Sequence, residues 1–267
     1  MAGWPSLDNS RVMSYKTTAL TGAAQIAGSY YELIASAPYS GVLMINANAY
    51  LNAAQYLYTI AIGAAGSETP ILTNLYTQSG VSSYVSNLDS AMTIPLFINK
   101  GSRVSVKAQC TTAASLFDIE AYLISSGMFS RNQYALCDTI GAVTGGSGGT
   151  SIDPGALPNS KGSWVQLSAS SARAYKGLTV GVGGAVNWTR TECYWSIDIG
   201  IGASPADQII VPDYVIRSHT NGDMMLPTMS PVFPVYVPKA TAISVRALCT
   251  IADATDRLFD VILYLLA

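Results

Sequence analysis

Charged side chains are scarce in this 267-residue sequence, where only 11% of the residues are Asp, Glu, Lys or Arg. Typical soluble domains carry about 25%, and a soluble monomer normally needs a more highly charged surface than this. The formal net charge of −2 excludes a strongly basic nucleic-acid binder, because such a domain clusters Lys and Arg. We therefore expect much of the surface to be buried against other copies of the chain or other proteins.

Long apolar runs, the residue pattern of a signal peptide and a cysteine framework are also not found in the sequence. No stretch of about 20 apolar residues occurs, so no membrane insertion is expected. The start MAGWPSLDNSRVMSYK has no cationic segment followed by an apolar core, so no signal peptide is expected. Of four cysteines, Cys110 and Cys249 lie at equivalent positions of a repeat, whereas Cys137 and Cys193 have no counterpart. This pattern predicts four reduced, mostly buried thiols in a protein made in a cytoplasm.

One stretch of the sequence occurs twice. The first copy, from Ile94 to Ile124, reads IPLFINKGSRVSVKAQCTTAASLFDIEAYLI, and the second runs from Phe233 to Leu266. Pro95 matches Pro234 and Cys110 matches Cys249, at one offset (234 − 95 = 139; 249 − 110 = 139). Further motifs in the first half of the chain match motifs in the second half, and the offset between matching residues rises in steps along the sequence. The steps indicate insertions in loops between retained strands, so we predict an internal duplication.

Short runs of alternating apolar and polar residues predict strands throughout both copies. About seven such strands per copy are typical of a β-sandwich or jelly roll. The fold class predicted is all-β, with two tandem β-sandwich domains in which each final apolar strand lies centrally in its sheet. The expected boundaries are an N-terminal arm over 1–14, a first repeat over 15–127, a connecting segment with a Gly/Ser-rich linker over 128–158 and a second repeat over 159–267.

Titratable residues give no convincing catalytic pattern, and we expect no enzyme activity, metal or cofactor. His219 is the one histidine and lies in a turn-rich segment, which favours an exposed loop residue. A Ser-His-Asp triad on His219 is the alternative, although no G-x-S-x-G elbow accompanies it. Asp118 and Asp260 recur in both copies, and Asp118 with Glu120 could form the carboxylate pair of a glycosidase. The second copy has Ile262 in place of Glu120, which favours a structural role for the repeated aspartates.

Aromatic residues are the remaining candidates for a functional surface. Tyrosine occurs 16 times, and Trp164 and Trp188 mark the second copy. Such residues are enriched in protein interfaces, and exposed ones also stack on sugar rings. The candidate positions for an interface or a glycan contact are Tyr30, Tyr39, Trp164, Trp188 and His219.

The motifs KGSWVQL, AYKGLTVGV, SIDIGIGA, PVYVPKATAISVRA and VILYLL occur in this order in the second copy. In this respect it resembles a β-sandwich module of tailed-bacteriophage structural proteins, of the head-decoration, head-fibre or tail-fibre type. The first copy is similar but diverged, with Ala61 in place of Gly200. The resemblance implies a non-enzymatic, oligomeric part of a virion and carries no catalytic residues across.

We therefore expect a structural component of a phage particle, assembled in the host cytoplasm and located on the virion exterior. Its expected partners are further copies of the chain, with a trimer as the first guess, and other virion proteins of the capsid or tail. The alternative is a carbohydrate- or receptor-binding module for host attachment, whose partner would be a cell-surface glycan.

Overall fold

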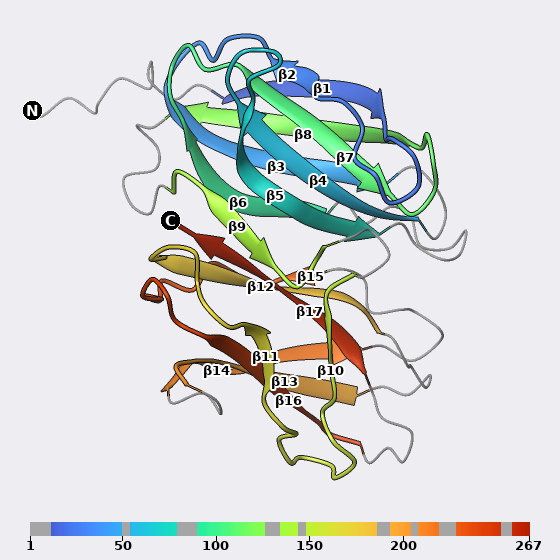
Figure 1. The fold of residues 1–267 in the computed structure, drawn as a ribbon, viewed down its shortest axis with the longest axis vertical. Coiled ribbons are helices and arrows are strands. Elements are labelled where there is room, and N and C mark those ends of the chain that lie inside the picture. Colours follow the sequence, from blue (N-terminus) through green and yellow to red (C-terminus); the bar gives the residue numbers. More distant parts are fainter. Residues whose placement is uncertain are drawn as a thin grey trace, which may run out of the picture. The chain divides into compact units, whose positions relative to one another are not determined.

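The computed structural model describes residues 12–49, 54–78, 90–125, 134–143, 148–185, 193–203, 208–218, 228–251 and 258–267. These residues form strands and loops and include no helix, which confirms the all-β prediction. No described helix therefore meets the length and apolarity that a membrane span requires. The described residues divide into two compact units, one of residues 12–138 and one of residues 139–267 (Figure 1).

The first unit is a sandwich of two antiparallel sheets. One sheet has the order β1–β8–β3–β6, and the other has the order β5–β4–β7–β2, with β9 joined to β5 in parallel at Leu72 and Cys137. The strands are β1 (Val12–Leu20), β2 (Tyr31–Ile34), β3 (Gly41–Ala49), β4 (Gln55–Ile62), β5 (Thr69–Gln78), β6 (Ser90–Ile98), β7 (Val104–Cys110), β8 (Leu116–Ser125) and β9 (Cys137–Ile140).

The second unit repeats this arrangement strand for strand. Its sheets have the orders β10–β17–β12–β15 and β11–β16–β13–β14. The strands are β10 (Thr150–Ile152), β11 (Val165–Ser168), β12 (Gly177–Ala185), β13 (Cys193–Ile201), β14 (Gln208–Ser218), β15 (Thr228–Met229), β16 (Ile243–Cys249) and β17 (Phe259–Leu266). Numbered within each unit, both read 1–8–3–6 and 2–7–4–5, the order of an eight-stranded jelly roll built from two Greek keys.

Strand register confirms that the units are copies of one another. In the first unit β4 pairs with β7 so that Tyr56 lies opposite Cys110, and in the second β13 pairs with β16 so that Trp195 lies opposite Cys249. The residues of the second pair follow the matching residues of the first pair by the same number of positions (195 − 56 = 139; 249 − 110 = 139). The bulges between β4 and β5 recur at equivalent positions between β13 and β14.

Backbone conformation repeats as well. Four positions with positive φ in the first unit have positive φ at the matching position of the second, although the residue type changes in three of them. The pairs are Gln25 and Asn159, Gly63 and Gly202, Asn74 and Asp213, and Gly101 and Ala240. Because non-glycine residues adopt this region at a cost, its retention indicates that the turns were inherited together with the strands.

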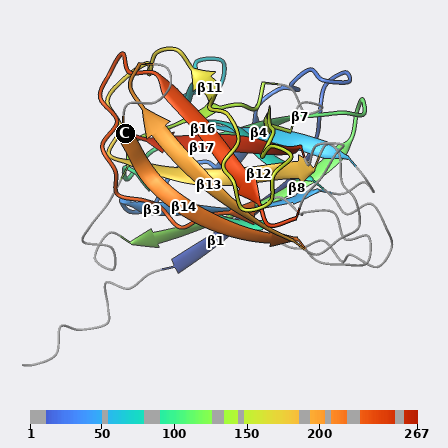
Figure 2. The same cartoon turned by 90° about the horizontal axis from the view of Figure 1, so that it is seen from below.

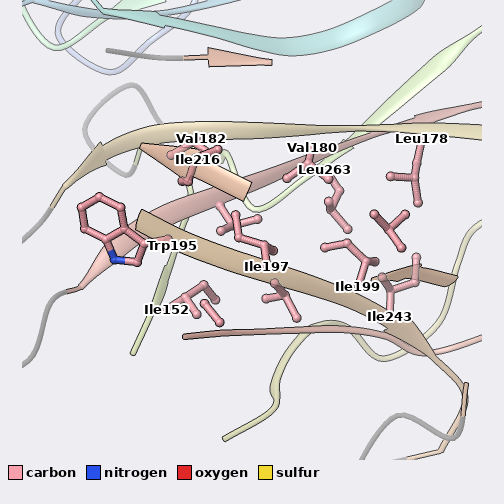
Figure 3. Packing of buried hydrophobic residues seen from close by; sticks show 14 of the residues in the cluster. Ile152, Leu178, Val180, Val182, Trp195, Ile197, Ile199, Ile216, Ile243 and Leu263 are labelled. Atoms are coloured by element: carbon pink, nitrogen blue, oxygen red, sulfur yellow. The ribbon is translucent and has the colours of Figure 1, made fainter. Parts of the chain in front are cut away.

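The core of the second unit lies between its two sheets, where the inward residues of β12, β13, β16 and β17 meet (Figure 3). Trp195, Ile197 and Ile199 of β13 are buried there beside Leu178 and Leu263. The alternation places Ser196 and Asp198 on the opposite face of β13. The long final strands are central in their sheets as predicted, with β8 between β1 and β3, and β17 between β10 and β12.

Three expected boundaries were wrong. The arm predicted over 1–14 overlaps β1, which begins at Val12, while residues 1–11 lie outside the described part of the chain. The first unit continues past 127 to Asp138. The connecting segment over 128–158 contains β9 and also β10, the first strand of the second jelly roll. A strand of three residues such as β10 is too short to show a period of two, so the Gly/Ser composition around it dominated the prediction.

All four cysteines are buried and free, as predicted.

Candidate functional site

A cluster of charged side chains lies on the outward face of the β11–β16–β13–β14 sheet, the sheet that Figure 2 views with β16, β13 and β14 side by side. Its centre is Asp198 of β13, whose side chain is only 4% exposed. Lys161, from the loop before β11, places its Nζ 2.8 Å from Asp198 Oδ1 and 2.8 Å from Asp213 Oδ1. From β16, Arg246 donates its Nε–H to Asp198 Oδ2 at 2.9 Å.

Hydrogen bonds complete this cluster, which we call the Asp198 cluster (Lys161, Ser196, Asp198, Asp213 and Arg246). The backbone N–H of Asp213 donates to Asp198 Oδ1 at 2.9 Å. Lys161 Nζ also donates to Ser196 Oγ at 2.9 Å, and that hydroxyl donates to Asp213 Oδ1 at 2.7 Å. The bulged, left-handed conformation of Asp213 turns its N–H toward the centre of the sheet.

The electrostatics of the Asp198 cluster favour ionised carboxylates. Burial of Asp198 opposes ionisation, but the N–H of Asp213 and the side chains of Lys161 and Arg246 outweigh it and hold the pKa of Asp198 below its usual value. The hydrogen bonds from Lys161 and Ser196 likewise lower the pKa of Asp213. A general acid at neutral pH needs a raised pKa, so this pair suits structural tethering or ligand contact better than acid–base chemistry.

The first unit lacks the Asp198 cluster. The positions that match Asp198, Ser196 and Lys161 hold Thr59, Leu57 and Ala27. The position that matches Arg246 holds Lys107, and the position that matches Asp213 holds Asn74. The cluster is therefore a property of the second copy. The first copy has a charged group of its own, in which Arg103 pairs with Glu32 and Glu68.

Two of the aromatic candidates occupy matching places and carry matching partners. Lys107 Nζ lies 4.5 Å from the centroid of the Tyr30 ring, and Arg246 Cζ lies 4.6 Å from the centroid of the Trp164 ring. Both are cation–π pairs in which the cation comes from β7 or its equivalent β16. Retention of the pair in both units indicates that it fixes the entry into β2 and β11.

Of the other three candidates, Tyr39 is the one among the described residues, and its role is structural. Tyr39 donates its hydroxyl to the carbonyl of Leu123 at 2.8 Å, which ties the approach to β3 to strand β8. Trp188 and His219 lie outside the described residues. Of the three described positions, Trp164 is the one that joins the Asp198 cluster, through Arg246.

The repeated aspartates have different surroundings. Asp118 accepts a hydrogen bond from Thr18 and lies 3.6 Å from Lys16 Nζ, both on β1. Asp260 pairs through its backbone with Ser151 of β10, and Gly149 approaches its side chain so closely that an added Cβ would be 2.9 Å from Asp260 Cβ. Desolvation by burial raises the pKa of Asp260 to about 6. Within the part of the chain that is described, no group of three or more His, Cys, Asp or Glu residues could hold a metal ion.

Sequence reasoning missed the Asp198 cluster, although a signal for it was present. Asp198 interrupts the apolar run from Trp195 to Ile201, and on a buried strand a lone carboxylate at an outward position requires partners. The partners come from a loop 37 residues earlier and a strand 48 residues later, so they could not be paired before the topology was known.

The fold and this site define a tandem jelly-roll protein. No protein-family model matches the chain, and no curated protein matches it. Among solved structures, the chain is similar to one described as a recombinant peptide N-glycanase F (PNGase F). The two are 12% identical, the TM-score is 0.42, and the alignment covers 96% of this chain and 95% of that one. A similarity of this size has no functional implication for this chain.

Proposed function

We propose that the protein is a non-enzymatic structural component of a bacteriophage particle, located on the virion exterior as a capsid-decoration or tail component. The observation that carries the proposal is the duplication of a complete eight-stranded jelly roll in one charge-poor chain. Jelly rolls recur in viral capsid proteins, which is an analogy at the level of the fold. The scarcity of charge favours surfaces that are covered in an assembly.

Exposed apolar side chains of the first unit support the same proposal. Val12 and Leu20 of β1, and Leu116 and Tyr122 of β8, are each at least 36% exposed. Their positions in the register place all four on the outward face of the β1–β8–β3–β6 sheet. They lie toward the two ends of these strands, on either side of the ion pairs of Lys16 with Asp118 and Glu120. Exposed apolar groups beside polar ones are common on interaction surfaces.

Labelling of intact particles tests this proposal. Antibodies against the purified chain should decorate intact phage particles from an infected culture, and the chain should co-sediment with the particles in a density gradient. Preimmune serum is the control. If the chain stayed in the soluble fraction while known capsid proteins sedimented, the virion proposal would be wrong.

A second candidate, a carbohydrate- or receptor-binding module, is favoured by the Asp198 cluster. Asp213 keeps 69% of its side chain exposed although it is part of a hydrogen-bonded network. Trp164 lies next to the same cluster and offers an aromatic surface. A carboxylate beside an aromatic ring can bond the hydroxyls of a sugar while the ring packs on its apolar face.

A glycan array with three proteins tests the second candidate. The wild-type chain should bind a defined glycan, and Trp164→Ala should weaken binding about 5- to 150-fold, if a sugar ring stacks with the roughly 1–3 kcal/mol that planar bases gain on aromatic side chains. Tyr30→Ala, which removes the equivalent ring from the first unit, is the matched control and should bind as the wild type does. Equal loss in both variants, or an array without any bound glycan, would count against this site.

A further inference from the structure

Strand β1 is the one long sheet edge among the described residues that has neither a proline, nor a bulge, nor a strand or loop bonded to its open side. It pairs with β8 over nine consecutive residues without a bulge. It contains no proline, and its one charged residue is Lys16. An edge of this kind presents a row of unpaired N–H and C=O groups to any strand that approaches.

The other edges are each short, covered or interrupted. Strands β2, β10, β11 and β15 have at most four residues. Strand β6 contains Pro95 and is bonded by Tyr134, whose carbonyl accepts from Phe97 N–H at 2.8 Å. Strand β5 contains Pro70 and pairs with β9 at Leu72. Strand β14 is long but contains Pro212 and two bulges in its pairing with β13. Natural sheets use such devices, and edge lysines as well, to prevent edge-to-edge association. Strand β1 has only Lys16, whose charge is already paired with Asp118 and Glu120, so it is the least protected long edge among the described residues.

The direction of the free groups on β1 follows from its pairing. The N–H of Thr21 donates to the carbonyl of Ser115 at 2.9 Å, so Thr21 faces β8. In an antiparallel ladder alternate residues face the same neighbour. The N–H and C=O groups of Ser14, Lys16 and Thr18 therefore point away from β8, toward the open edge.

We propose that this edge pairs, antiparallel, with the β1 edge of a second copy of the chain. A pairing of two identical edges has two-fold symmetry, so it predicts a dimer in place of the trimer suggested by the sequence. A two-fold axis at Lys16 would place two ammonium groups opposite each other. An axis at Thr17 instead places each Lys16 opposite Thr18 of the other copy and each Leu20 opposite Ser14, diagonal to Val12.

The exposed apolar groups fit this register. Leu20 lies beside Leu116 within its own sheet, and the pairing brings it within reach of Val12 of the other copy. One such apolar group forms at each end of the paired strands. Lys16 stays next to Asp118 and Glu120 of its own chain, so its charge is already balanced.

Solution mass by light scattering tests the dimer. The full chain of 28.1 kDa should show twice that mass at high concentration. Lys16→Pro should raise the dimer dissociation constant at least about tenfold over Lys16→Ala, because both lose the ammonium but only proline removes an outward N–H. A monomer at the highest soluble concentration, a trimer, or equal effects of the two variants would overturn the proposal.

A cysteine at the proposed axis tests the register independently. Thr17→Cys should form an intermolecular disulfide under mild oxidation, since facing residues in a non-hydrogen-bonded pair lie about 4.5 Å apart at Cα. The wild-type chain is the control, because its four cysteines are buried. A dimer in which this variant remains uncrosslinked would overturn the Thr17 axis. Dimer formation is measured on the free protein, so its failure is distinguishable from failure of the virion proposal.

Discussion

Replacing Asp198 with alanine is expected to destabilise the second unit by about 2 to 4 kcal/mol. The change removes the acceptor that holds Lys161, Arg246 and the N–H of Asp213. Breaking a buried ion pair from one side typically costs about 3–5 kcal/mol. We expect a somewhat smaller loss here because the side chains of Lys161 and Arg246 are 18% and 28% exposed, so water can hydrate them once the carboxylate is removed.

Denaturant unfolding followed by tryptophan fluorescence measures this loss. Three of the four tryptophans, Trp164, Trp188 and Trp195, belong to the second half of the chain, so the signal reports mainly on that unit. Thr59→Ala, at the matching position of the first unit, is the control and should change stability by less than about 0.5 kcal/mol. Stability equal to the wild type in Asp198→Ala would show that the cluster does not hold the sheet and its loop together.

The second large effect is a pH-dependent gain in stability for Asp260→Asn. The folded chain raises the pKa of Asp260 to about 6, whereas an unfolded chain leaves an aspartate near about 3.9. Below about pH 4 both states are protonated and burial of the carboxyl costs little. Between about pH 4 and 6 the unfolded state releases its proton first, so stability falls as pH rises, and above about pH 6 the full cost is present.

We expect Asp260→Asn to be more stable than the wild type by about 1 to 2 kcal/mol at pH 7, a range that allows for partial screening by solvent. The difference should disappear toward pH 4. Asp118→Asn is the matched control, and it should give no gain at pH 7 because it loses the ion pair with Lys16, while its amide oxygen can still accept from Thr18. Parallel stability curves for Asp260→Asn and the wild type across this range would contradict the prediction. Thermal unfolding at a series of pH values provides the measurement.

The internal duplication of the fold could be predicted from the sequence. A constant offset between Pro95 and Pro234, and between Cys110 and Cys249, was visible because strands with buried faces tolerate few insertions. Strand order was not visible, since two Greek keys bring together strands that are far apart in the chain. The shortest strands, such as β10, were missed because three residues cannot establish a period.

The candidate site was harder to predict from the sequence than the fold was. Trp164 was recognised as an aromatic of interest, but its partner Arg246 comes from a strand about 80 residues later. Asp198 was noted only as part of the SIDIGIGA motif of the second copy. The ion pairs that give it significance exist because β13 lies between β16 and β14, which is a consequence of topology and not of local sequence.

The shared register of the two units has a consequence for folding. Because β4 and β13 have matching partners at matching spacing, each could dock against the wrong copy of its neighbour while the chain folds. Tandem repeats commonly misassemble in this way. If β4 paired with β16, Thr59 would stand where Asp198 belongs, and Arg246 would have no carboxylate to receive its Nε–H. The Asp198 cluster would thus make the mismatched pair less stable than the native one, and divergence at five positions allows each strand to select its own sheet.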